Sequence, residues 1–265
     1  MRFGICSSSS HWKEIAEIGY DFAEYNLSAL AQATDEKFDS ILQAQKESGI
    51  RVEACNGFFP ANFKLYAYHE DGSENAEDFA QIKQTVLHYV EGVFPRAEQL
   101  GVRVAILGSA GARSIPGGVD RTMAERQFLQ ILRICADVGQ KHGILITLEP
   151  LNYSETNFLN TAAEGLDFAR RAEHMNVGAM VDFYHHYYNK ESLDTFGGAM
   201  PLLSHVHLAN PMRNNPTALD SKFIAERMEI LRTIGYDGRV SLECNMGEDF
   251  VLSAKDSYEL LKQYK

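Results

Sequence analysis

The sequence lacks several features that would place it in a special class of protein. No stretch approaches the eighteen consecutive apolar residues that a membrane-spanning helix needs, and the opening MRFGICSSSSHW lacks a signal-peptide profile. The four cysteines are scattered without a CxxC pair, which favours free thiols over a disulfide framework. Lys and Arg number 25 against 36 Asp and Glu, and this net charge of −11 argues against a nucleic-acid partner. We therefore expect a cytoplasmic protein that binds neither membrane nor nucleic acid.

Helix ends are marked repeatedly along the chain. The 265 residues contain no linker-like segment, and an apolar fraction of 45% is enough for one full core. Five times a helical stretch ends in Gly and an apolar run follows almost at once, at Gly19, Gly49, Gly101, Gly143 and Gly235. Gly is the usual residue where a helix ends through a left-handed conformation, so each instance predicts a short turn from helix to strand.

Eight apolar runs predict the strands: RFGIC, YDFAEY, RVEAC, VAILG, ILITLE, GAMVD, LSHVHL and RVSLE. Because they alternate with amphipathic stretches, they indicate a parallel sheet buried on both faces. The helix near ESLDTFGGAMP, between the sixth and seventh runs, is the least regular. Capping boxes at Thr161 with Glu164, and at Ser253 with Asp256, predict two helix starts. Eight such units predict one domain over residues 1–265, a single (β/α)₈ TIM barrel, with a doubly wound sheet as the alternative.

Four successive predicted strands end on a potential metal ligand, namely Glu149, Asp182, His207 and Glu243. In a TIM barrel these ends surround one mouth, where active sites are built. Three carboxylates there repel by about 3 kcal/mol per pair at ~5 Å and an effective dielectric constant of ~20, unless a divalent cation is bound. Three oxygen donors and one imidazole suit Mn²⁺, with Mg²⁺, Co²⁺ or Zn²⁺ as alternatives. One such residue alone would indicate only a solvated polar group, but four in consecutive strands predict a metal site.

Motifs in the second half of the chain add a resemblance. The segments LEPLNYSETNFLN, VDFYHH, HVHLANPMR and SLECN resemble those of the xylose isomerase-like TIM barrels. They look most like the sugar phosphate isomerase/epimerase branch, which contains D-tagatose 3-epimerase, D-psicose epimerase and hydroxypyruvate isomerase. The resemblance implies that the four strand-end residues bind the metal and that Glu155, His185 and Arg213 contact the substrate.

The resemblance also implies a reaction. We expect a ketose 3-epimerase or aldose–ketose isomerase that acts on a small sugar or sugar phosphate, in a homodimer or homotetramer. Both reactions remove a proton from the carbon beside a carbonyl through an enediolate, which a bound metal stabilises. Glu149 and Glu243 would flank the sugar as the acid/base pair. His185 and Arg213 would donate hydrogen bonds to the carbonyl and an adjacent hydroxyl.

Some polar residues near the predicted mouth have two interpretations. Glu24 either orients a metal-binding histidine from behind or lies at the rim. His186 and His205 are predicted to be structural. Cys55 and Cys244 lie next to the mouth, but no His-paired thiol can be recognised.

Two long loops also have open interpretations. The segment 57–76 is either a lid or wall over the sugar, or a packed excursion or dimer contact. The segment 108–118 lacks the GK[ST] of a Walker-type phosphate loop. Its Arg113 either binds a phosphate or hydroxyl, or is a solvated loop arginine.

Three other functions remain open. A lyase or dehydratase acting on a polyol ketone also begins with enolisation. An endonuclease IV-type nuclease needs further strand-end histidines, whereas the third and fourth strands end at Asn56 and Ser109. A non-catalytic sugar-binding barrel would not require two flanking glutamates. Fold alone does not separate these functions.

Overall fold

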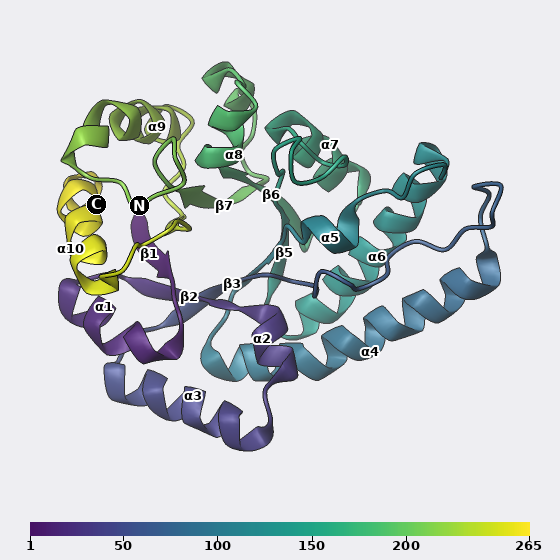
Figure 1. The fold of residues 1–265 in the computed structure, drawn as a ribbon, viewed down its shortest axis with the longest axis horizontal. Helices are drawn as coiled ribbons and strands as arrows, with labels where there is room; N and C mark the ends of the chain where they lie inside the picture. The colour runs from purple at the N-terminus through teal and green to yellow at the C-terminus, as the bar shows by residue number, and fades with distance from the viewer.

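The computed structural model describes residues 1–265, and its centre is a closed barrel of eight parallel strands that pair in sequence order (Figure 1). The strands are β1 (Arg2–Cys6), β2 (Phe22–Asn26), β3 (Val52–Asn56), β4 (Val104–Leu107), β5 (Leu145–Leu148), β6 (Val177–Asp182), β7 (Leu203–Leu208) and β8 (Arg239–Leu242). Pairing of β1 with β8 closes the barrel. Every strand falls on a predicted apolar run, so the predicted (β/α)₈ barrel is confirmed and the doubly wound sheet is excluded.

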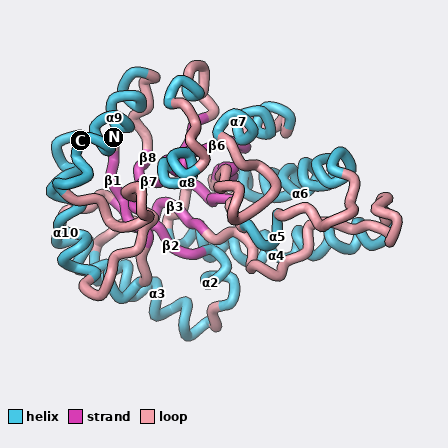
Figure 2. The backbone as a smooth tube through the Cα atoms, turned by 45° about the horizontal axis from the view of Figure 1, so that its top comes forward, coloured by secondary structure: helices cyan, strands magenta, loops and turns pink.

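Helices form the outer layer around these strands (Figure 1). They are α1 (Trp12–Ile18), α2 (Leu27–Gln32), α3 (Asp35–Ser48), α4 (Ala76–Leu100), α5 (Ala110–Arg113), α6 (Arg121–Lys141), α7 (Ala162–Arg171), α8 (Phe183–Tyr188), α9 (Ser221–Thr233) and α10 (Phe250–Leu261). Four short 3₁₀ helices are η1 (Ser9–His11), η2 (Leu193–Phe196), η3 (Ala218–Asp220) and η4 (Lys262–Tyr264). The long helices α4 and α6 extend together to one side of the barrel (Figure 2). None of the helices is both long and apolar enough to cross a membrane.

Several predicted helix boundaries can be checked directly. Gly19, Gly49 and Gly101 are left-handed C-caps of α1, α3 and α4, as predicted. The capping box of Thr161 with Glu164 is present at the start of α7. The box at Ser253 is wrong, because α10 begins earlier with Asp249 as its N-cap, which accepts from Leu252 N at 2.9 Å. An upstream Asp caps as well as Ser, and using it lengthens the helix by a turn.

The sixth helical unit is the least regular, as expected from the sequence. The segment near residues 191–201 forms only the short η2, and the helix that follows β6 is instead α8. The Asp182 carboxylate caps α8 by accepting from Tyr184 N at 2.7 Å and from His185 N at 3.3 Å. The residue that ends β6 therefore also fixes the start of the helix that carries His185.

Alternation along the strands produces an apolar layer inside the barrel with a polar layer above it. Apolar side chains from four strands form a small cluster apart from the main core, and Phe22, Ala54, Ile106 and Met180 belong to it. Successive strand residues point to opposite faces, so the residue two positions further along each strand faces the same interior. Those positions are Glu24, Asn56, Gly108 and Asp182. The fold thus places polar groups, and one residue with no side chain, toward the carboxyl-end mouth.

Candidate active site

The four predicted metal ligands are brought together at this mouth. One donor atom from each of Glu149, Asp182, His207 and Glu243 lies within 4.8 Å of the others. Asp182 and His207 are buried at the ends of β6 and β7, and Glu149, directly after β5, is also buried. Glu243, directly after β8, is the most open, with 21% of its side chain exposed. The structure therefore confirms that the predicted residues converge.

The imidazole of His207 is the centre of the cluster. Its Nδ1 lies 2.9 Å from Glu149 Oε1, 3.6 Å from Glu243 Oε2 and 3.9 Å from Asp182 Oδ2. Burial lowers the pKa of His207, but the carboxylates of Glu24, Glu243 and Glu149 outweigh it and raise that pKa well above its ordinary value. Nδ1 of His207 therefore lies at the point on which three carboxylates converge.

The crowding of negative charge also shifts the pKa of a carboxyl group in the cluster. Burial, together with Glu149 and Asp182, raises the pKa of Glu243 to about 7 against the opposing attraction of His207. Asp182 Oδ2 is buried and has no hydrogen-bond partner. His185 Nε2, which lies 3.8 Å from Asp182 Oδ2, is also buried without a partner. A buried carboxylate oxygen without a donor is costly, and a cation would satisfy it. Three carboxylate oxygens and one imidazole nitrogen fit a divalent cation of the Mn²⁺ or Mg²⁺ type.

Glu24 lies behind His207 and not at the rim. Of its two sequence interpretations, the structure therefore favours the one in which Glu24 orients the histidine. Its carboxylate accepts from His207 Nε2 at 2.8 Å and from His205 Nε2 at 2.9 Å. Burial opposes ionisation, but the two imidazoles hold the pKa of Glu24 well below its ordinary value. His205 is a buried, hydrogen-bonded core residue, as predicted. His186 is also structural, since it is buried and its Nε2 lies 3.3 Å from the Ser192 carbonyl oxygen.

The three predicted substrate contacts lie beside the cluster. Arg213 donates to Glu155 Oε1 at 2.9 Å and to Glu243 Oε2 at 3.4 Å, and its guanidinium lies over the Tyr184 ring at 5.0 Å. The buried His185 has Nδ1 at 3.9 Å from Glu155 Oε1. These contacts place the guanidinium, the imidazole and Glu155 in one network at the mouth.

Two asparagines complete the network and were not singled out from the sequence as site residues. Asn152 donates to His185 Nδ1 at 2.8 Å and to Glu155 Oε1 at 3.1 Å. Asn56, at the end of β3, donates to Glu243 Oε1 at 2.8 Å. The strand-end position of Asn56 is the signal that could have identified it. Asn152 has a weaker signal, its place within the LEPLN motif.

Both sequence interpretations of Arg113 are wrong. The side chain is fully buried, and its guanidinium donates to the backbone carbonyls of Glu149 at 2.7 Å, Leu159 at 3.3 Å and Leu107 at 3.4 Å. Burial lowers the pKa of Arg113 to about 10. Arg113 therefore holds the loops after β4 and β5 together, and its side chain reaches neither solvent nor a substrate phosphate.

The segment 57–76 packs against the loop after β4. Phe59 N donates to Ser109 Oγ at 2.9 Å, and the Tyr66 hydroxyl donates to the Arg113 carbonyl at 2.7 Å. Together with α4 and α5 it borders a cavity of about 1000 Å³ whose lining includes none of the residues around His207. These contacts favour the packed excursion over the lid.

Comparison with known proteins identifies the family of this chain and several relatives. A family model described as "Xylose isomerase-like TIM barrel" matches residues 12–264. The D-psicose 3-epimerase of Ruminiclostridium cellulolyticum is 28% identical over 239 residues, which cover 87% of this chain and 76% of the relative. The 3-dehydro-D-guloside 4-epimerase of Escherichia coli is 26% identical over 267 residues, covering 95% and 92%.

Solved structures give the same fold. A D-psicose 3-epimerase from Clostridium cellulolyticum H10 with D-tagatose has a TM-score of 0.78 at 20% identity, covering 100% of this chain and 98% of that one. An L-ribulose 3-epimerase has a TM-score of 0.79 at 18% identity, covering 99% and 94%. At these identities the likeness shows the fold alone.

Proposed function

The chain belongs to the xylose isomerase-like TIM barrel family, and from this premise we propose that it is a divalent-metal-dependent epimerase of small neutral sugars, of the ketose 3-epimerase kind. The two relatives described above are sugar epimerases, which supports the class of reaction. The observation that carries the proposal is the convergence of the Glu149, Asp182 and Glu243 carboxylates on His207 Nδ1.

The same four residues would hold the metal. His207 would give up its Nδ1 proton to become a ligand, while Nε2 keeps its hydrogen bond to Glu24. Gly108 leaves room for the Glu149 carboxylate, because a Cβ at this position would collide with it. The cation, when bound, supplies a Lewis acid that polarises a substrate carbonyl and stabilises negative charge on the neighbouring oxygen.

Proton transfer would fall to the two glutamates. Glu149 and Glu243 reach the same point from β5 and β8, which are separated by two strands of the barrel. A sugar bound between them meets one carboxylate on each face of its reacting carbon. One carboxylate oxygen removes the proton and the other returns one to the opposite face, which inverts the carbon.

Arg213, His185 and Glu155 would position the sugar. Ion pairs to Glu155 and Glu243 hold the Arg213 guanidinium at the mouth before any sugar binds. Together with His185 it can donate hydrogen bonds to a carbonyl and a neighbouring hydroxyl. Such pre-positioning lowers the entropic cost of reaching the reactive geometry.

The charge around the mouth favours a neutral sugar over a sugar phosphate. Of the two arginines that the sequence made candidates for polar substrate groups, Arg213 is paired with two carboxylates and Arg113 is committed to backbone carbonyls. A phosphate would therefore approach a cluster of carboxylates, and it could bind Arg213 only in competition with the ion pairs to Glu155 and Glu243.

The test is a panel of ketoses and their phosphates with Mn²⁺, with products separated by chromatography. We expect reversible conversion of a neutral ketose into its C3 epimer, loss of activity with EDTA and recovery with Mn²⁺. Glu149→Gln and Glu243→Gln should each lower turnover by at least ~10²-fold, whereas Glu229→Gln, on the exposed face of α9, should not. Activity that survives EDTA, or that requires a phosphorylated sugar, would contradict the proposal. An aldose product would identify an isomerase instead, and loss of water a dehydratase.

A further inference from the structure

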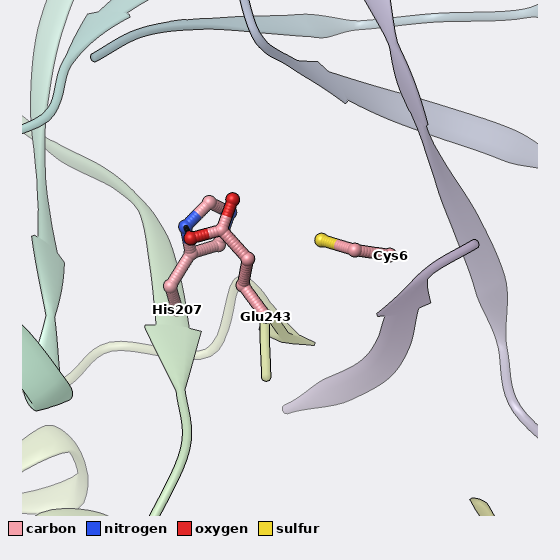
Figure 3. Close-up of side chains that lie close together, drawn as sticks. All are labelled: Cys6, His207 and Glu243. Carbon is pink, nitrogen blue, oxygen red and sulfur yellow. Dashed lines mark ion pairs between the residues drawn. The ribbon is translucent and has the colours of Figure 1, made fainter. Parts of the chain in front are cut away.

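Cys6 points into the proposed metal centre although the proposed reaction does not use it. It ends β1, and its Sγ is directed toward His207 and Glu243 (Figure 3). One donor atom from each of these three residues lies within 4.8 Å of the others. The β1–β8 register pairs Ile5 with Leu242, so Cys6 is level with Glu243 at the mouth. The thiol is free and partly exposed.

Neighbouring groups hold Cys6 and Glu243 side by side. The Asn56 amide donates to Cys6 Sγ at 3.6 Å and to Glu243 Oε1 at 2.8 Å. The mouth therefore contains two donor sets that share His207 and Glu243. In one set Glu149 and Asp182 add carboxylate oxygens, and Asp182 Oδ2 is buried without a hydrogen-bond partner. In the other set Cys6 adds a sulfur.

That exchange of oxygen for sulfur changes which cation is preferred. Carboxylate oxygens suit Mg²⁺ and Mn²⁺, whereas a thiolate with an imidazole selects Zn²⁺ and other thiophilic ions. From this geometry we infer that Cys6, His207 and Glu243 form a second, thiophilic metal site, which takes Zn²⁺ or Cd²⁺ and overlaps the proposed catalytic centre. Zn–S bonds of about 2.3 Å and Zn–N bonds of about 2.0–2.1 Å require the donors to move closer together. Rotation of the partly exposed Cys6 and Glu243 side chains provides this movement.

Occupation of this site excludes the proposed reaction. The S–H bond of Cys6 is replaced by a sulfur–metal bond, the proton leaves to solvent, and no electron is transferred. His207 and Glu243 are taken by the thiophilic ion, so the four-residue centre is incomplete and Glu243 no longer exchanges a proton. A thiophilic cation is therefore an inhibitor that competes with Mn²⁺. The inference rests on the proposed function, because it shares two of the four proposed ligands.

The test titrates the metal-stripped full chain with Cd²⁺ and follows thiolate-to-cadmium charge-transfer absorption in the ultraviolet. We expect saturation at one Cd²⁺ per chain in the wild type and loss of the absorption in Cys6→Ser. Cys244→Ser is the matched control, since Cys244 is partly exposed next to Glu243 but lies outside the donor set, and it should keep the absorption. Mn²⁺ binding, followed by the electron paramagnetic resonance of free Mn²⁺, should change less than about threefold in Cys6→Ser. The preference for Cd²⁺ over Mn²⁺ should fall at least tenfold.

The outcomes separate this inference from the proposed function. Absorption that persists in Cys6→Ser, or that is lost in Cys244→Ser, overturns the thiophilic site. Mn²⁺ binding to the wild type with no cadmium–thiolate absorption also overturns it and leaves the proposed function standing. Failure of Mn²⁺ to bind the wild type overturns the proposed metal centre itself. Alkylation of Cys6 by iodoacetamide, mapped by mass spectrometry, should be blocked by Cd²⁺ and not by Mn²⁺, and equal protection by both ions would contradict a sulfur ligand.

Discussion

At the residue scale, the two ring nitrogens of His207 have different tasks. Nδ1 faces the carboxylates of Glu149, Asp182 and Glu243, whereas Nε2 is fixed by Glu24 at 2.8 Å. A histidine whose second nitrogen donates to a carboxylate has its ring orientation set and its other nitrogen made more basic. Glu24 therefore acts through His207 and has no contact with the proposed metal position.

Glu24→Gln should weaken metal binding. The amide can still accept one hydrogen bond, but the negative charge behind His207 is lost, so Mn²⁺ affinity should fall about 10–100-fold. Isothermal titration calorimetry measures this change, with Glu229→Gln as the exposed control. The circular dichroism spectrum should stay the same, which separates a positioning role from a folding defect. An unchanged Mn²⁺ affinity would show that Glu24 does not support the site.

Sequence patterns located some of these residues and misjudged others for physical reasons. Glu149, Asp182 and Glu243 stand out because a charged residue interrupts an apolar strand at its end. Asn56 and Arg113 depend on partners distant in the sequence. Asn56 bonds Glu243, and Arg113 bonds carbonyls 36 and 46 residues away. No local pattern encodes such partners.

At the element scale, the loop after β4 fixes the loop after β5. Arg113 ends α5, and its guanidinium bonds the carbonyl of Glu149, the residue that carries a proposed ligand. Three backbone acceptors share this buried cation. The position of the Glu149 side chain is therefore set in part by an element that contributes no ligand.

Arg113→Met should destabilise the protein by at least ~2 kcal/mol, because it leaves buried carbonyls without donors. Arg103→Met, on an exposed side chain, should change stability by less than ~0.5 kcal/mol. Urea denaturation measures both variants. An unfolding midpoint of Arg113→Met equal to that of Arg103→Met would mean that Arg113 does not hold these loops together.

Glu191 gives the start of α7 a dependence on pH. Its carboxylate accepts from Ala162 N at 2.9 Å. Burial, with a contribution from Glu164, raises the pKa of Glu191 to about 7. The folded state therefore favours the protonated carboxyl. The contribution of the protonated Glu191 carboxyl to stability is complete below about pH 4.5 and is lost as the pH rises through 7.

Glu191→Gln keeps an acceptor oxygen without the charge, so it should stabilise the protein only where the wild type ionises. We expect equal melting temperatures near pH 4.5 and a variant that melts about 2–4 °C higher at pH 8, once partial exposure of the carboxyl is allowed for. Differential scanning calorimetry across this range is the measurement. A difference that does not vary with pH would show that ionisation of Glu191 is not responsible.

At the scale of the whole molecule, the barrel collects residues that are far apart in the chain. Strands β5 to β8 bring the four proposed ligands to one mouth, and β1 to β3 add Cys6, Glu24 and Asn56. The barrel was predictable because eight apolar runs alternate with amphipathic helices. The detailed contacts at its mouth were not, since they depend on strand register and loop packing. Because carboxylates gather at the mouth, we expect a bound cation to increase the stability of the folded state substantially.

Mn²⁺ should therefore raise the melting temperature relative to the EDTA-treated protein, because it binds the folded state alone and offsets carboxylate repulsion. A concentration of 100 times the Kd corresponds to about 2.7 kcal/mol. Asp182→Asn removes one proposed ligand and should lose most of this shift. A shift of the same size in Asp182→Asn would place the stabilising ion elsewhere.

Proton transfer between Glu149 and Glu243 can be followed by running the reaction in D₂O. A substrate ketose from the panel is incubated with the Mn²⁺-loaded protein, and the product is analysed by nuclear magnetic resonance and mass spectrometry. We expect one solvent deuterium at the inverted carbon of the epimer, with the labelled product lost in both Glu149→Gln and Glu243→Gln. Epimer formed without any deuterium at that carbon would contradict proton transfer by the two glutamates.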